Sequence, residues 1–531
     1  MQSSVQNMAH VLDEETPIKT RTMNIAKIFI TSLIALCTGT AGAQTAEADN
    51  ALLVPKRSLL KYNYIETLYE AGGIAGSGDY APMWHLSNRQ GLGSQENGWA
   101  YARVGVRGSH GIDLDILDFP IHLGWKADIV GGYGLASNVF IQQAYADFQY
   151  RAVHISLGQK ERWGELRNPR LSTGALTESG NARPIPQIRV ELPRYACILR
   201  DWLYIRGHIA YGWFTDEGWQ KDFVAEGKSR TVGVRYHSKA GFLRIGNKEA
   251  FPLTAEMGLH MVSQFGGKTH NWCNQEGKTV DSPTRLKDYW TAFMPTKGDS
   301  QNVAADQVNI AGNVLGSWFG ALTWNSKEWN LRLTYEHAFE DHSQMFWEYG
   351  LWTEQLVGIE LELKRFKWIK NVLFEYFNLK NQSGPVYHDS TAEIPDQISC
   401  RDNNYWHHTY NGWFNYGMMI GTPLVTSPIY NTDATLNVYN NRVEAFHFGI
   451  EGEPSEWFGY RALLTKSNNW GTYGKPFKKM KTSHSGLMEL TFKPNRSWSI
   501  RTSFAFDHGE LYGNNYGGMI TITRSVRTKI K

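Results

Sequence analysis

Apolar and polar residues alternate with a period of two along much of the chain. The clearest example runs from Phe119 to Ile129, where every odd position is apolar and the even positions include His122, Lys126 and Asp128. Similar stretches occur at 153–158, 203–211, 255–261 and 501–507. A strand with one apolar and one polar face suits a barrel wall between lipid and a watery lumen. The pattern predicts an all-β fold, a transmembrane antiparallel β-barrel of the outer-membrane type. A soluble β-sandwich or propeller is the alternative.

The N-terminal region has a different pattern, which is typical of an export signal. Met23 and Lys27 precede an apolar run from Ile28 to Leu36, and small residues lead to Ala41-Gly42-Ala43. This arrangement predicts a cleaved signal peptide over residues 1–43. Residues 1–22 are polar and acidic in front of it, so translation is expected to start at Met23. Cys37 follows Leu36, which is not small, and lipidation there is the less favoured alternative.

Residues 44–80 are expected to form a periplasmic lead-in to a barrel over residues 81–531. Within it, Leu60, Tyr64, Leu68 and Ala71 recur at helical spacing, and Gly72-Gly73 follows. This pattern predicts an amphipathic helix from Ser58 to Ala71.

Connection lengths predict an orientation. Bacterial barrels have short periplasmic turns and longer extracellular loops. The tight turn near Tyr150 to Ala152 is therefore expected in the periplasm, and the connections 132–138 and 160–186 outside. The first strand would then be 82–88.

Composition supports a barrel without suggesting a cofactor. Of the 531 residues, 42% are apolar and 13% aromatic, with 51 glycines. The mean hydropathy of −0.42 is compatible with strands that face a polar lumen on one side. The net charge of +3 gives no reason to expect a nucleic-acid partner. Three cysteines (Cys197, Cys273 and Cys400) lie beyond the signal and show no metal-binding spacing, and at most one pair could form a disulfide. No apolar run is long enough for a membrane-spanning helix.

Eight short blocks resemble, in order, a known family of barrels. They are 81–91 (APMWHLSNRQG), 179–187 (SGNARPIPQ), 335–341 (YEHAFED), 382–385 (QSGP), 412–424, 441–443 (NRV), 449–452 (GIEG) and 469–473 (NWGTY). Together they resemble the Wzi-type capsule assembly outer-membrane proteins, in the branch found in Bacteroidetes. The likeness extends from about residue 60 to residue 520. One departure is the C-terminus, Thr528 to Lys531, which lacks the terminal aromatic residue of many barrels. An internal assembly signal near Tyr516 or a short terminal extension would explain it.

The resemblance implies a monomeric barrel of about 18 strands with periplasmic helical elements, embedded among outer-membrane lipid and lipopolysaccharide. It also implies a non-catalytic, lectin-like protein that anchors or assembles capsular or extracellular polysaccharide at the cell surface. No cofactor is implied.

Two segments carry the residue types that polysaccharide binding needs. Aromatic rings can stack on sugars, and arginine can hold carboxylates through two parallel hydrogen bonds. The segment 160–187 carries cations and a tryptophan, and 386–413 is rich in aromatic residues. The candidate carbohydrate-binding residues are Arg162, Trp163, Arg167, Arg170, Tyr387, Trp406 and Tyr410. The favoured explanation for any one of these residues is structural: the cations would pair with Glu161, Glu165 and Glu178 or with lipopolysaccharide phosphates, and the aromatic residues would form a girdle at the membrane interface.

Catalysis and metal binding are weakly supported. His337, Glu340, Asp341 and Ser343 cluster in sequence but do not all share a strand face, so a structural polar network is favoured over an active site. His407 and His408 would point to opposite faces of a strand, which argues against a metal site. A porin-like channel for small polar solutes or saccharides is the main alternative function. It would be lined by Lys126, Asp128, Arg206, His208 and Glu256.

Overall fold

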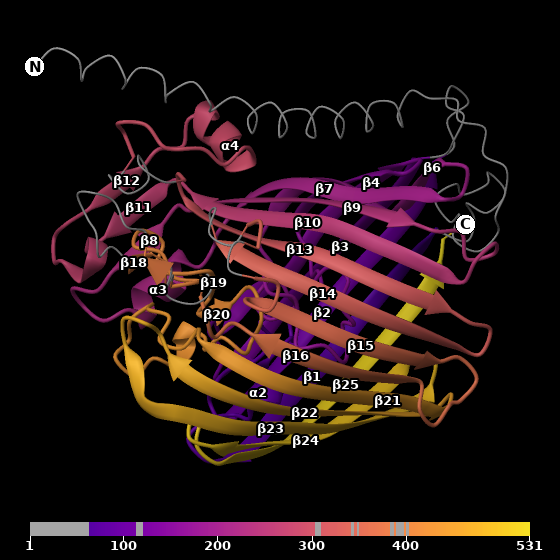
Figure 1. Cartoon of the computed structure of the whole chain (residues 1–531). Helices are drawn as coiled ribbons and strands as arrows, with labels where there is room; N and C mark the ends of the chain where they lie inside the picture. The colour runs from indigo at the N-terminus through magenta and orange to yellow at the C-terminus, as the bar shows by residue number, and fades with distance from the viewer. Residues whose placement is uncertain are drawn as a thin grey trace, which may run out of the picture.

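The computed structural model of the chain forms a closed antiparallel β-barrel of eighteen strands (Figure 1). It describes residues 63–112, 121–302, 310–340, 345–347, 350–382 and 403–530, with the backbone alone at 387–388 and 398–399. Each barrel strand pairs with the next barrel strand along the chain, and the last pairs with the first, Tyr64 opposite Lys529. The predicted fold class and the strand number implied by the family resemblance are both confirmed.

The barrel strands coincide with the alternating stretches of the sequence. They are β1 (Tyr64–Ser77), β2 (Gly98–Ile112), β3 (Ile121–Tyr133), β4 (Val139–Tyr150), β5 (Val153–Gln159), β6 (Gln187–Leu199), β7 (Leu203–Trp213), β9 (Arg235–Ile245), β10 (Leu253–Phe265), β13 (Asn313–Asn325), β14 (Trp329–Glu340), β15 (Gln355–Leu363), β16 (Asn371–Asn378), β21 (Val443–Ser455), β22 (Phe458–Gly471), β23 (Pro476–Asn495), β24 (Trp498–Gly509) and β25 (Asn515–Lys529).

The two ends of the barrel differ in their connections. One end has tight turns, such as those between β4 and β5 and between β24 and its neighbour β23. We call this the short-turn end. The other, the long-loop end, carries three small sheets, namely β8 (Arg230–Val232) with β11 (Gly267–His270) and β12 (Val280–Ser282), β17 (Tyr387–His388) with β18 (Ile398–Ser399), and β19 (Phe414–Asn415) with β20 (Met418–Met419). It also carries helices α3 (Glu217–Phe223) and α4 (Leu286–Phe293) and the short 3-10 helices η2 (Trp272–Asn274) and η3 (Pro428–Tyr430) (Figure 1).

Exposed tryptophans mark the short-turn end, in its turns and on the adjoining strand ends. Trp202, Trp324, Trp368, Trp457 and Trp498 all lie within a few residues of a short turn, and all are exposed. Aromatic residues at this level form the girdle by which barrels sit at a membrane interface. That the short-turn end is the periplasmic one remains a prediction.

Three connections from the long-loop end fold into the lumen, and we call them the plug: residues 78–97, 160–186 and 403–442. They hydrogen-bond to one another, for example from Gln90 N to Gly180 O (2.6 Å) and from Ser179 N to Ile420 O (2.8 Å). The largest hydrophobic cluster of the described residues joins the plug to the wall, with Leu86, Leu176 and Trp413 fully buried in it. The lumen therefore contains a packed core.

Three sequence predictions about the first ninety residues are wrong. Residues 64–77 form β1 and not a helix, so the barrel begins at least as early as Tyr64 and not at residue 81. The helical spacing of Tyr64, Leu68 and Ala71 arises by chance in a strand paired on both edges. The predicted strand 82–88 is the short helix α2 (Met83–Leu86) inside the lumen, where all four of its side chains are buried. Residues 58–62 lie outside the described part of the chain.

The C-terminal residues belong to the barrel. Thr528 and Lys529 pair with β1 within β25, so they are not an extension beyond the barrel. No helix among the described residues is long and apolar enough to cross a membrane. The signal peptide, residues 1–43, lies outside the described residues and stays a prediction.

Candidate functional site

The largest cavity described is a chamber in the half of the lumen nearest the short-turn end, with a volume of about 940 Å³. Its wall is built by inward side chains at the short-turn ends of β6, β7, β9, β10 and β13 to β16, and residues 160–167 of the plug cover it. The volume falls within the range typical of small-molecule binding sites. Segment 160–186, predicted as an extracellular loop, is thus an internal element. Leu171 and Leu176 bury their side chains in the plug core, which draws the segment inward.

The chamber is strongly charged and has a cationic excess. Eight Lys and Arg side chains line it against five glutamates. Several of these charges are neutralised in place: Arg206 Nη1 lies 2.7 Å from Glu165 Oε2, and Arg332 Nη2 lies 3.0 Å from Glu256 Oε2. The strand alternation therefore predicted correctly that Arg206 and Glu256 face the lumen.

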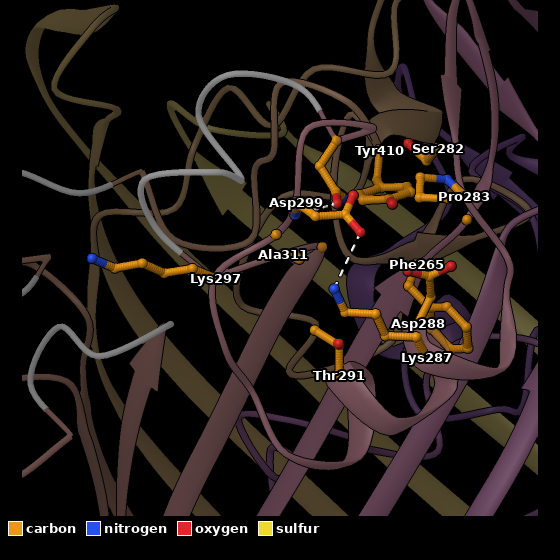
Figure 2. A pocket seen from close by; sticks show the side chains of 14 residues that line it. Phe265, Ser282, Pro283, Lys287, Asp288, Thr291, Lys297, Asp299, Ala311 and Tyr410 are labelled. Carbon is orange, nitrogen blue, oxygen red and sulfur yellow. Dashed lines mark hydrogen bonds and ion pairs between the residues drawn. The ribbon is translucent and has the colours of Figure 1, made fainter. Parts of the chain in front are cut away.

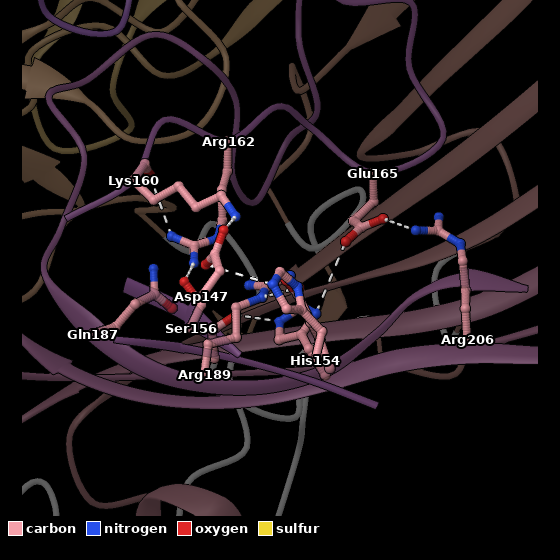
Figure 3. A network of polar contacts seen from close by, with 12 residues as sticks. Asp147, His154, Ser156, Lys160, Arg162, Glu165, Gln187, Arg189 and Arg206 are labelled. Carbon is pink, nitrogen blue, oxygen red and sulfur yellow. Dashed lines mark hydrogen bonds and ion pairs between the residues drawn. The ribbon is translucent and has the colours of Figure 1, made fainter. Parts of the chain in front are cut away.

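One ion-pair chain links β4, β5 and β6 to the plug beside the chamber (Figure 3). Lys160 Nζ lies 2.7 Å from Asp147 Oδ2, and Asp147 also faces His154 at 3.5 Å. His154 Nδ1 lies 3.1 Å from Glu191, whose other oxygen accepts a 2.6 Å hydrogen bond from Arg189 Nε. Each carboxylate in this chain is shared by two cationic partners, which fixes the wall.

Arg162 differs from the other cations of this network. Its guanidinium donates to Ser156 Oγ and to the Lys160 carbonyl, both at 3.2 Å, and the structure records no ion pair for it among the described residues. Burial, together with the nearby Arg189 cation, lowers the pKa of Arg162 to about 10. Glu191 and Glu178 attract this guanidinium without forming an ion pair with it, and an anionic ligand in direct contact would add to that attraction, because an opposite charge within a few ångströms favours the charged form.

Trp163 adds an aromatic surface beside Arg162. It lines the chamber and remains 48% exposed. Its ring lies directly against Gly180, where an added Cβ would come within 2.5 Å of the ring. The absence of a side chain at Gly180 thus leaves the space that the Trp163 ring occupies. A half-exposed indole can stack on a sugar ring, while the adjacent guanidinium, whose recorded hydrogen bonds go only to neutral acceptors, can hold a carboxylate of the same sugar.

Two other predicted residues of this segment are held in ion pairs. Arg167 is buried, donating to Glu336 Oε2 (2.9 Å), Thr334 Oγ1 (3.0 Å) and the Leu356 carbonyl (3.0 Å). Glu336 also accepts from the backbone of Leu176 at 2.7 Å, so this pair fixes the plug to β14. Arg170 is partly exposed and pairs with Glu451 at 2.5 Å. Of the two, only Arg167 lines the chamber.

The predicted aromatic residues lie away from the chamber. Tyr410 is buried in the plug core, and Trp406 is half-buried against it. Tyr387 lies in β17, and its side chain is outside the described part of the structure. The structure thus brings Arg162, Trp163 and Arg167 together but does not join them to Trp406 or Tyr410. Neither of those two belongs to a membrane girdle.

Among the described residues, the other candidate clusters are only partly brought together. His337 and Glu340 lie on opposite faces of β14, while Asp341 and Ser343 lie outside the described residues. His407 and His408 lie in a loop with ring centres 4.2 Å apart, so their predicted opposite orientation is wrong. Among the described residues no group of three potential metal ligands occurs.

Two residues predicted to line a channel are held in ion pairs. Lys126 and Asp128 pair with each other at 3.0 Å, and Asp128 also pairs with Arg103.

Sequence reasoning missed most of the chamber. Arg189, Arg194, Arg244, Tyr195 and Arg332 line it, although none was singled out as a site residue. All five occupy strand positions, and their signal was the same alternation that identified Arg206, although β6 shifts register between Leu192 and Ala196, beside Arg194 and Tyr195. The sequence could not reveal which inward-facing strand residues border the chamber and which are covered by the plug.

Comparisons with known proteins agree on the fold. No family model and no curated protein matches the chain. Among solved structures, Wzi of Escherichia coli, described as a carbohydrate-binding β-barrel involved in group 1 capsule assembly, aligns over 92% of this chain and 90% of its own. The TM-score is 0.50 and the identity 13%. OccAB4 of Acinetobacter baumannii aligns over 88% and 100% (TM-score 0.43, 10% identity), and OccK3 of Pseudomonas aeruginosa over 89% and 97% (TM-score 0.43, 11% identity). The likeness to Wzi shows the fold of an outer-membrane barrel.

Proposed function

We propose that this protein is an integral outer-membrane barrel that binds an acidic polysaccharide without catalysis and so helps to anchor or assemble it at the cell surface. The observation that carries the proposal is that Arg162 and Trp163, adjacent in sequence, both line the chamber. The structure records no ion pair for Arg162 among the described residues, and Trp163 offers an exposed, seated ring. The fold likeness to a carbohydrate-binding barrel supports the same reading.

The chamber fits a few sugar units better than a long stretch of polymer. At about 940 Å³ it is the size of a small-ligand site, and each unit would be held weakly. A polymer with repeated acidic units can still be retained, because many sites on neighbouring molecules engage the same chain. If the short-turn end is periplasmic, the chamber meets the polymer on that side, which favours a role in its assembly before it reaches the surface.

A porin-like channel is the second candidate, favoured by the polar, charged lining of the chamber. The plug argues against it, since residues such as Leu176 and Trp413 fill the other half of the lumen with a packed core. Planar-bilayer recordings separate the two functions. A sealed binding barrel should give no steady open current, whereas a pore should conduct continuously.

The proposal is tested with the purified full-length protein and polysaccharide from its own source organism. Binding of the acidic polymer, weakened by added salt because exposed charges are screened over about 8–10 Å, is expected. A neutral glucan is the control and should not bind. In cells, deletion should leave synthesis intact and raise the polysaccharide found in the medium. An unchanged capsule together with no binding in solution would refute the proposal, and steady currents would then favour the pore.

A further inference from the structure

The outer wall of β9 carries polar side chains where lipid is expected. Strand alternation places His237 and Lys239 on the same face as Leu243 and Ile245, which are 40% and 52% exposed on the outside of the barrel. His237 is nevertheless almost fully buried, and Lys239 is only partly exposed. Something outside the barrel therefore covers this part of the wall.

The cover is α4, which lies against the outside of β7, β9 and β10 near the long-loop end (Figure 1). Tyr211 of β7 donates its hydroxyl to the Tyr289 carbonyl at 2.9 Å, and Lys239 donates to the Phe293 carbonyl. The rings of Phe265 and Tyr289 are 5.0 Å apart. The inner face of α4 thus satisfies a polar patch that lipid could not.

A second segment continues this cover over β13 and β14. Trp318, on the outer face of β13, donates to the Met345 carbonyl at 2.8 Å. His337, outward on β14 yet fully buried, lies with its ring 5.3 Å from that of Trp347. Met261, Ile310, Val314 and Phe339 form a hydrophobic cluster beneath it. We call α4, Ile310 and residues 345–347 and 350–353 the collar.

The collar turns apolar side chains away from the barrel. Leu286 and Trp290, one helical turn apart on α4, are 89% and 58% exposed. Phe346, Leu351 and Trp352 are also exposed. The polar residues at this helix point elsewhere: Lys287 lies 3.2 Å from Asp299 (Figure 2). Arg285, just before α4, pairs with both Asp288 and Asp299. Leu286 and Trp290 therefore form an apolar surface that is separate from the ion pairs of Arg285 and Lys287 with Asp299.

We propose that the collar is a membrane-interfacial element, with Leu286 and Trp290 inserted at the boundary between headgroups and acyl chains. The occupant is the bilayer because the collar rests on the barrel's lipid-facing wall and its apolar face continues that of Leu243, Met257 and Leu322, all of which are exposed. Short amphipathic helices and tryptophans favour this depth. The proposal does not depend on the polysaccharide function.

Site-directed fluorescence quenching tests it. In a background with Cys37, Cys197, Cys273 and Cys400 replaced by Ser, a single Leu286→Cys is labelled with an environment-sensitive fluorophore. The full-length barrel is reconstituted in vesicles of phosphatidylcholine and phosphatidylglycerol. Lipids that carry a quencher near the headgroup should quench this site several-fold more than lipids that carry it at the acyl end.

Two matched sites calibrate the result. Lys221→Cys on α3, an exposed position at the same end of the barrel, should show little quenching by either lipid. Leu322→Cys on the outer wall should be quenched strongly. Quenching at Leu286 no greater than at Lys221 would overturn the proposal. Crosslinking between labelled copies in place of lipid quenching would also overturn it and would identify the collar as a self-association surface.

Discussion

The two halves of the lumen are built from the same strands yet have opposite characters. Toward the long-loop end, Trp413, Met419 and Val425 of the plug are fully buried in an apolar core. Toward the short-turn end, the strands face a chamber lined by eight cationic side chains and five glutamates. The boundary between them is the segment 160–186, which contributes leucines to the core and Arg162 and Trp163 to the chamber.

This contrast shows how one barrel can be both sealed and polar. Burying a polar wall under an apolar plug would cost free energy unless each group found a partner. Glu336 and Glu375 find theirs in the plug itself: Glu375 accepts from Ser172 Oγ at 2.7 Å and from the Thr173 backbone at 2.8 Å. The carboxylates of Glu336 and Glu375 therefore attach the plug to the wall. The excess of positive charge lies on the other side of the plug, in the chamber.

The largest effect is expected where the two halves join. Arg167→Ala would leave Glu336 buried without its cation, a change that typically costs about 3–5 kcal/mol. Segment 160–186 should loosen, and the variant should show open currents in planar bilayers that the unmodified protein lacks.

The control for this prediction is Arg170→Ala, three residues along. Its partly exposed pair with Glu451 should contribute no more than about 1 kcal/mol, and its recordings should stay closed. Equal conductance in both variants, or in neither, would contradict the role given to Arg167.

Two tryptophans separate packing from binding. Trp413→Ala removes a fully buried ring whose indole donates to the Thr177 carbonyl at 2.7 Å, and should destabilise the folded state by about 3–5 kcal/mol. Trp163→Ala should leave thermal stability nearly unchanged and weaken saccharide binding about 2- to 10-fold, in line with about 0.5–1.5 kcal/mol for an aromatic contact. Thermal unfolding measures the first effect and binding titrations the second. A stability loss in Trp163→Ala, or a binding loss without a stability loss in Trp413→Ala, would contradict the assignment of Trp413 to the core and Trp163 to the binding site.

A smaller effect concerns Asp216, which begins α3 and accepts from the Tyr416 backbone at 3.3 Å. Burial raises its pKa to about 6 from an ordinary value of 3.8. Its proton is held more tightly in the folded state, so its stabilising contribution is present below about pH 4 and is lost as the pH rises through about 6. Protease resistance of the plug should fall over this range, and Asp216→Asn should flatten the dependence. An identical pH profile in the variant would exclude Asp216 as the cause.

The sequence revealed the wall better than the lumen. Period-two alternation identified strands such as β3, β7 and β10 and the inward direction of Arg206 and Glu256, because a barrel imposes that period directly. The plug has no such period. The pattern of residues 160–186 indicated a loop rich in cations, and only tertiary contacts reveal that Arg167 is buried against Glu336 while Arg162 has no ion pair within the described part of the chain.

The helix prediction for residues 58–71 failed for a related reason. A few apolar residues at helical spacing cannot outweigh pairing along both edges of a strand, which β1 makes with β2 and β25. Likewise, Tyr410 was selected for its residue type, whereas the plug core decides its environment. Residue type indicates what chemistry is available, and burial decides whether it can be used.

The central claim is that Arg162, for which the described residues show no ion pair, supplies the positive charge that binds an acidic ligand in the chamber, and affinity for an acidic oligosaccharide tests it most directly. Isothermal titration of Arg162→Gln against the unmodified protein should show a loss of at least tenfold, as expected for a charge-assisted hydrogen bond of about 1.5–3 kcal/mol. Arg170→Gln should bind normally, and the salt dependence of binding should weaken only in Arg162→Gln. Equal affinity of Arg162→Gln and the unmodified protein, with both folded, would contradict the claim.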